Sequence, residues 1–152
     1  MDSPETFFKQ IVISFTTLAR LFVKDFVAGG YDMSGTYEDL AVWQSAMELV
    51  VGVYEITRKF PREEMYGLTS QIRRAAVSVA SNIAEGKGRA SDKELTQFLC
   101  HARGSPFEIE TQLRLCERLG YSKQEEVELL RREATRIGQM LNGLIRAVRP
   151  AA

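Results

Sequence analysis

Apolar side chains recur at alternating steps of three and four residues through the last quarter of the chain. This series comprises Val127, Leu130, Ala134, Ile137, Leu141, Leu144 and Val148. Such spacing places the side chains on one face of an α-helix. No segment of the sequence alternates between apolar and polar residues with period two over the length of a strand. The pattern therefore predicts an all-helical protein.

A helix is also predicted from Tyr37 to Phe60, and it carries two apolar stripes side by side. The first stripe comprises Leu40, Trp43, Met47, Val50, Tyr54 and Thr57. The second comprises Ala46, Leu49, Val53, Ile56 and Phe60. A helix that packs on one side needs an apolar arc of only about 100°. The doubled stripe therefore predicts contact on a second side, and we expect the chain to form a homo-oligomer.

Two further helices are predicted between these. One runs from Leu68 to Glu85, with an inward face of Leu68, Ile72, Ala75, Val79 and Ile83 and many small side chains, and Gly86 is expected to end it. The next starts at a capping box of Ser91 and Glu94 and ends at Gly120. Pro106 leaves two interpretations of this helix open, a kink or a break with a restart.

The last helix is expected to start at a capping box formed by Ser122 and Glu125. Four long helices joined by short loops predict an antiparallel up-and-down four-helix bundle over residues 36–149, because short connections force neighbouring helices to run in opposite directions. We expect the bundle to be one domain, since a chain of 152 residues supports a single hydrophobic core.

Residues 1–35 are predicted to be an N-terminal extension, either helical or disordered. An amphipathic stripe comprises Phe8, Ile11, Phe15, Leu18 and Phe22. The alternative is a poorly fixed extension that arises from an upstream start codon, because Met33 opens a segment suited to be a natural N-terminus. The longest uncharged run, residues 11–19, is too short to span a bilayer, so no membrane association is expected.

The charges are balanced, with 20 Lys and Arg against 20 Asp and Glu. No overall basic field is therefore available to hold nucleic acid, and any such binding must come from local clusters. The candidate contacts to a phosphate backbone are Arg73, Arg74, Lys87, Arg89, Arg132, Arg136, Arg146 and Arg149. The competing interpretation is that these side chains are solvated surface charges.

The sequence gives little support for catalysis. The single histidine, His101, has no Glu three residues before it, so the metal-binding pairs of di-iron bundles are absent. Cys100 precedes His101, but adjacent residues on a helix do not face each other. We expect no catalytic residue, metal or cofactor. Cys100 and Cys116 lie too far apart on one helix for a disulfide, which predicts free thiols in a reducing cytoplasm.

One long motif resembles a known family. The segment from Tyr66 to Ser78, followed by Ser81 to Gly86, is similar to the signature of the bacterial four-helix-bundle family encoded in intervening sequences of 23S ribosomal RNA. The entry motif from Tyr37 to Ala46 also resembles that family, as does a third-helix motif of Gly104, Ser105, Glu108, Gln112 and Leu113. The resemblance covers roughly residues 36–148.

The resemblance implies a ring-shaped homopentamer without enzymatic activity. The accessory variability protein of diversity-generating retroelements is similar, and it binds nucleic acid and a reverse transcriptase. Three hypotheses follow for this chain. The first is an oligomeric accessory protein that binds RNA or DNA. The second is a ring-shaped scaffold that binds a protein partner, and the third is an enzyme whose site the sequence does not reveal.

Overall fold

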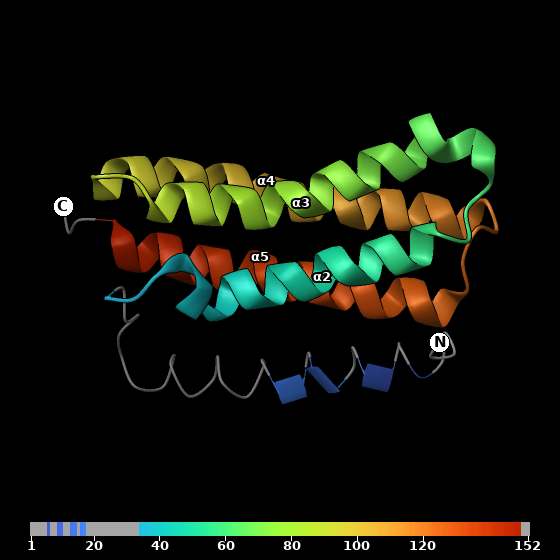
Figure 1. The fold of residues 1–152 in the computed structure, drawn as a ribbon, viewed down its shortest axis with the longest axis horizontal. Helices are drawn as coiled ribbons and strands as arrows, with labels where there is room; N and C mark the ends of the chain where they lie inside the picture. Colours follow the sequence, from blue (N-terminus) through green and yellow to red (C-terminus); the bar gives the residue numbers. More distant parts are fainter. Residues whose placement is uncertain (1–5, 7–8, 11–12, 15, 18–33, 150–152) are drawn as a thin grey trace.

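The computed structural model describes residues 6, 9–10, 13–14, 16–17 and 34–149. It contains four long helices, and the labels of Figure 1 are kept here. These are α2 (Ala41–Thr57), α3 (Leu68–Lys87), α4 (Asp92–Arg118) and α5 (Gln124–Val148), with the short 3-10 helices η1 (Tyr37–Asp39) and η2 (Arg62–Tyr66). No strand occurs in these residues. The predicted stripe at Phe8, Ile11, Phe15, Leu18 and Phe22 lies outside the described residues.

The four helices form an up-and-down bundle, as the sequence predicts. Each helix packs against its neighbours in the chain, and α5 returns to close the bundle against α2, whereas the diagonal pairs α2–α4 and α3–α5 make no backbone contact. Figure 1 shows α3 and α4 lying over α2 and α5. Short connections, such as the one between α3 and α4, produce this arrangement because they return the chain beside the helix it has just left.

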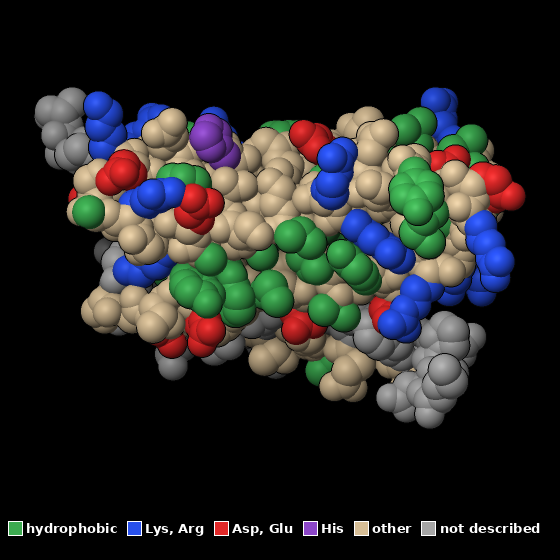
Figure 2. All heavy atoms as spheres, turned by 45° about the horizontal axis from the view of Figure 1, so that its top comes forward, with side chains coloured by type: hydrophobic (Ala, Val, Ile, Leu, Met, Phe, Trp, Pro, Cys, Tyr) green, Lys and Arg blue, Asp and Glu red, His purple; other side chains and the backbone are tan. Residues whose placement is uncertain are grey.

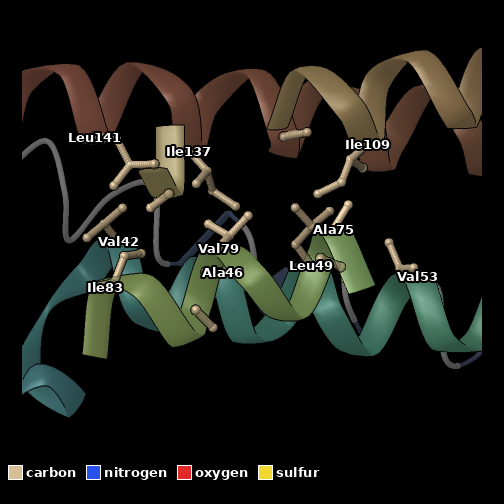
Figure 3. Close-up of a cluster of buried hydrophobic side chains, with 14 of the residues drawn as sticks. Val42, Ala46, Leu49, Val53, Ala75, Val79, Ile83, Ile109, Ile137 and Leu141 are labelled. Carbon is tan, nitrogen blue, oxygen red and sulfur yellow. The ribbon is translucent and has the colours of Figure 1, made fainter. Parts of the chain in front are cut away.

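The core contains one apolar face from each helix (Figure 3). Ile72, Val79 and Ile83 of α3 are fully buried, as are Ile137 and Leu141 of α5. Each of these residues belongs to a stripe predicted from the sequence. Burying a side chain of this size stabilises the fold by roughly 1.5–3 kcal/mol.

Of the two stripes on α2, the second is buried along its length, whereas the first is buried only at its ends, at Leu40 and Thr57. Ala46, Leu49 and Val53 are fully buried, whereas Met47 is 38% exposed and Tyr54 is 41% exposed. The bundle therefore covers part of the first stripe, and Met47 and Tyr54 in its middle remain on the surface.

Pro106 does not break α4, which runs without interruption from Asp92 to Arg118. The sequence left a kink or a break open, and the break is wrong. Proline lacks the N–H that would bond the carbonyl four residues earlier, at Ala102. Both Pro106 and Ala102 are buried. The packing of α4 against α3 and α5 therefore holds the helix together across the missing hydrogen bond.

Two glycines, Gly86 and Gly120, were predicted to end helices, and only one of these predictions is confirmed. Gly120 follows α4 with a φ of +72°, a left-handed conformation typical of a helix stop, which confirms the prediction. The prediction for Gly86 was wrong, because α3 continues to Lys87 and Gly86 is buried inside it. A Cβ at Gly86 would lie 2.7 Å from the Cβ of Phe98 on α4. This glycine is needed for the close approach of two helices rather than for a turn.

Of the two predicted capping boxes, one is confirmed and the other is wrong. Ser91 caps α4, since its Oγ accepts a hydrogen bond from the backbone N–H of Glu94 at 3.3 Å. Ser122 does not cap α5, because that helix begins at Gln124 with Lys123 at the cap position. The hydroxyl of Ser122 is instead buried without a hydrogen-bond partner. The prediction of a cap at Ser122 and Glu125 was therefore wrong.

Candidate interaction surfaces

Exposed apolar side chains gather on the face formed by α2 and α3, and we call this set the apolar strip. It comprises Met47, Val51 and Tyr54 of α2 and Val77 of α3, each about two-fifths exposed. The three α2 residues are spaced by four and three, so they share one helical face. Figure 2 shows apolar side chains gathered along the middle of the molecule. Met47 and Tyr54 belong to the first predicted stripe, whereas Val51 and Val77 were not predicted to be part of it.

Arg73 lies beside this strip and holds α2 and α3 together. Its guanidinium carbon sits 4.6 Å from the centre of the Tyr54 ring, which is a cation–π contact. Its Nε donates a hydrogen bond of 2.8 Å to the hydroxyl of Thr57, which is buried. Arg73 is a predicted nucleic-acid contact, and the structure shows that its charge is already engaged within the protomer.

Arg89 and Arg136, two other predicted nucleic-acid contacts, are also engaged. Arg89 pairs with Glu85 and covers the ring of Phe98 at 4.8 Å. Arg136 pairs with Glu133 at 2.8 Å and donates to the Ser45 hydroxyl of α2 at 3.3 Å. Burial raises the pKa of Glu133, and the charge of Arg136 partly offsets this. These contacts join α5 to α2 and order the end of α3.

The remaining predicted basic residues do not form one cluster. Arg74 lies in the second turn of α3 and Lys87 is its last residue, so the two are 13 residues and about 20 Å apart along the helix. Arg132, Arg146 and Arg149 are exposed on or just beyond α5. In Figure 2, blue and red side chains are interspersed. The basic residues thus occupy separate places on the surface.

A polar hollow between α3 and α4, which we call the polar groove, was not predicted. It has a volume of about 260 Å³ and is lined by Gln71, Arg74, Ala75, Ser78, Ser105, Glu108 and Gln112. On α3 the other three residues follow Gln71 by three, four and seven positions, and on α4 the other two follow Ser105 by three and seven, which places each set on one side of its helix. All seven belong to two of the three motifs that carry the family resemblance, and this was the signal available in the sequence.

Hydrogen bonding at the floor of the polar groove is incomplete. The Ser105 hydroxyl donates to the Ser78 hydroxyl at 3.2 Å, and the Asn82 amide donates to the same oxygen at 3.0 Å. The Gln112 Oε1 is buried without a hydrogen-bond partner. Within the described residues, neither Arg74 nor Glu108 forms an ion pair. The groove therefore carries two opposite charges without an ion-pair partner, and the unpartnered Gln112 Oε1 is buried.

The two cysteines are free, and they differ in environment. Cys100 is half-buried beside the exposed His101, whose ring meets the edge of Phe98 at 6.1 Å. Burial raises the pKa of the Cys116 thiol to about 12.

In the described part of the chain, no group of three or more His, Cys, Asp or Glu residues could hold a metal ion. The helices there are also too short or too polar to cross a bilayer.

The burial of Cys116 predicts unequal thiol reactivity. At pH 8, an aromatic disulfide reagent should modify one thiol in the folded wild type and none in a Cys100→Ser variant, because only a thiolate reacts. Denaturant should expose the second thiol. Because the pKa is 9.0 in the unfolded chain and about 12 in the folded one, stability should be full below pH 9.0 and fall as the pH rises toward 12. Equal rates for both thiols in the folded protein would contradict this.

Comparison with solved structures supports the fold. A protein of unknown function from the S23 ribosomal protein family of Bacteroides thetaiotaomicron has a similar structure, with a TM-score of 0.62 and 24% sequence identity. The match covers 69% of this chain and 98% of the other. At that identity the likeness shows the helical bundle alone. No curated protein matches the sequence.

A family model settles the relationship of the sequence. The model described as 23S rRNA-intervening sequence protein matches residues 38–143, which is more than half of the chain. That range runs from η1 through most of α5, so it includes the apolar strip and the polar groove. It also includes the motifs on which the resemblance rests, except for Tyr37 at the start of the entry motif. The chain therefore belongs to the 23S rRNA-intervening sequence protein family.

Proposed function

We propose that this protein is a non-enzymatic homo-oligomer whose assembly binds RNA. The observation that carries the proposal is the apolar strip, because Met47, Val51, Tyr54 and Val77 remain exposed after the core is complete. Contiguous apolar patches on monomers are small, and larger ones mark interaction sites. A second copy of the chain is the simplest partner, since each protomer carries the same strip. By family resemblance, the assembly contains five subunits.

Assembly compensates for the balanced charge of the single chain. Arg132, Arg146 and Arg149 are exposed at α5, and none of them forms an ion pair within the described residues. A protomer with so few available cations binds a polyanion weakly. Five copies acting on one strand raise the effective concentration for each later contact, so that the ring binds where the protomer does not.

The test is RNA binding across a range of salt concentrations. The intact assembly should bind structured or single-stranded RNA at low ionic strength. The logarithm of the affinity should fall with the logarithm of the salt concentration, by about 0.7 to 0.9 for each phosphate neutralised. Replacing Arg132 and Arg146 by Glu should weaken binding at least tenfold without changing the mass of the assembly, because these arginines contact only the strand.

The matched control replaces Arg62 and Arg118 by Glu. Both are exposed arginines outside the proposed contact set, and the change in net charge is the same. Equal loss of binding in both double variants would show a nonspecific charge effect and contradict the assignment to α5. DNA is tested in parallel, since backbone contacts alone do not distinguish the two polymers.

The second candidate is a ring-shaped scaffold that binds a protein and no nucleic acid. The internal engagement of Arg73, Arg89 and Arg136 favours it, because these charges are not available to a strand. An intact oligomer that shows no salt-sensitive binding to RNA or DNA would favour this alternative.

The similarity to the accessory variability protein stays a prediction. The two free thiols fit a cytoplasmic location.

A further inference from the structure

Two side chains of opposite charge line the polar groove from different helices without pairing. Arg74 belongs to α3 and Glu108 to α4, and within the described residues neither forms an ion pair with the other or with a third group. The axes of packed helices lie about 8–10 Å apart, so a molecule of a few heavy atoms is long enough to contact both side chains. The groove therefore has a positive wall on α3 and a negative wall on α4.

The floor of the polar groove carries a hydrogen-bond donor that the protomer does not use. The Ser78 and Ser105 hydroxyls lie 3.2 Å apart, and the Asn82 amide donates to the Ser78 oxygen at 3.0 Å. Two hydroxyls have two protons, and the bond between them uses only one, whichever of the two donates. The other proton has no acceptor among the described residues. A ligand in the groove can therefore accept it.

This donor lies close to the positive wall. Ser78 follows Arg74 by four positions on α3, which places the two side chains about 5–6 Å apart on one face of the helix. A guanidinium binds a carboxylate through two parallel charge-assisted hydrogen bonds, and a neighbouring hydroxyl can add a third. The α3 side of the groove is therefore suited to a carboxylate.

The negative wall and the size of the groove define the rest of the ligand. An ammonium group has three donors and no acceptor, so it complements the Glu108 carboxylate. The volume of about 260 Å³ lies below the roughly 300–1,000 Å³ of pockets that hold drug-sized ligands. The ligand is therefore small, with a carboxylate and an ammonium group only a few atoms apart. An α-amino acid carries both groups on one carbon.

We propose that the polar groove binds a free α-amino acid with a small side chain, whose carboxylate contacts Arg74 and whose ammonium group contacts Glu108. This site is additional to the proposed assembly, because none of its residues belongs to the apolar strip. RNA fits less well, since Glu108 repels phosphate and no aromatic side chain among the described residues lines the groove to stack a base. A charged side chain of another protein would pair with only one wall.

The first test titrates the intact full chain with L-alanine and with L-serine, followed by saturation-transfer NMR at pH 6.5. Both should bind with a dissociation constant of about 1 mM or lower. L-lactate has a hydroxyl in place of the ammonium group, and L-alaninamide has an amide in place of the carboxylate. Each should bind at least about tenfold more weakly than L-alanine, because each leaves one charged wall without a partner.

The second test changes the two walls. Arg74→Gln and Glu108→Gln should each weaken the binding of L-alanine at least about tenfold. The double variant Arg74→Glu with Glu108→Arg keeps one charge of each sign in the groove, so it should bind L-alanine more tightly than either single variant. The matched controls are Arg114→Gln and Glu125→Gln, which alter exposed positions away from the groove and should bind like the wild type. Circular dichroism and thermal melting check that each variant folds.

Three results would overturn the inference. In the first, neither probe binds at concentrations up to about 10 mM, ten times the expected dissociation constant. In the second, L-lactate or L-alaninamide binds as tightly as L-alanine, which means that only one charge is recognised. In the third, Arg74→Gln and Glu108→Gln bind L-alanine like the wild type, which places the binding elsewhere. A monomeric wild type that binds no RNA would refute the proposed function and leave this test unaffected, because one protomer contains the whole groove.

Discussion

Replacing Met47 and Val77 by Glu should convert the assembled protein into folded monomers. Each side chain is about two-fifths exposed in the protomer, so the substitution leaves the core intact. In an interface, the same two positions would bury carboxylates among apolar groups, and an unpaired buried charge costs several kcal/mol. Repetition around the proposed ring would multiply that cost. We expect the dissociation constant to rise at least a thousandfold, measured by light scattering over a dilution series.

The control replaces Met65 and Leu119 by Glu. These are apolar residues that are at least as exposed, at 50% and 53%, and they lie outside the apolar strip. This control should keep the mass of the wild type. If both double variants dissociate equally, general charge repulsion is the cause and the assignment of the interface to the strip is wrong.

Gly86→Ala should destabilise the protein by about 1–3 kcal/mol, the usual cost of overpacking a well-packed interior. The added methyl would lie 2.7 Å from the Phe98 Cβ and 3.2 Å from the Leu95 Cδ1, both on α4. The Phe98 Cβ at the closer contact is attached directly to the backbone and is not the far end of a flexible side chain, so the backbones of α3 and α4 must separate. Urea unfolding of the intact assembly at one fixed protein concentration measures the change.

Gly138→Ala is the matched control for this prediction. Gly138 lies inside α5, and a Cβ there would meet no atom within 4 Å. The same substitution should therefore stabilise the protein by up to about 1 kcal/mol, because alanine favours the helix more than glycine does. Equal effects at the two sites would show that helix propensity, and not the approach of α3 to α4, decides the outcome at Gly86.

The helices could be predicted from the sequence because their cause is local. The spacing of Val127 to Val148 is a property of consecutive residues, and one amphipathic face is enough to specify the helix. Helix ends were harder to predict where a tertiary contact intervened. Glycine is the residue type that typically ends a helix, so the sequence suggested an end at Gly86. Only the position of Phe98 in the structure shows that Gly86 is a packing residue. Proline likewise often breaks a helix, but α4 continues through Pro106 because its packing against the neighbouring helices keeps it helical.

The candidate surfaces could be predicted only in part. The doubled stripe on α2 predicted contact on a second side, and Met47 and Tyr54 of the first stripe are exposed. The prediction that the basic residues contact nucleic acid did not anticipate their internal hydrogen bonds. Arg73 and Arg136 donate to hydroxyls of α2, and these acceptors lie 16 and 91 residues away in the sequence, respectively. The polar groove was missed because its residues come from two helices. Their adjacency depends on the pairing of α3 with α4, which the motifs alone do not give.

The molar mass of the wild-type chain is the most direct test of the central claim. Light scattering coupled to size exclusion, at micromolar concentration and moderate salt, should return a multiple of 17.2 kDa. Five subunits correspond to about 86 kDa, five times the chain mass. A mass of 17.2 kDa across that concentration range would contradict the account, because the apolar strip would then be exposed without a second copy to cover it.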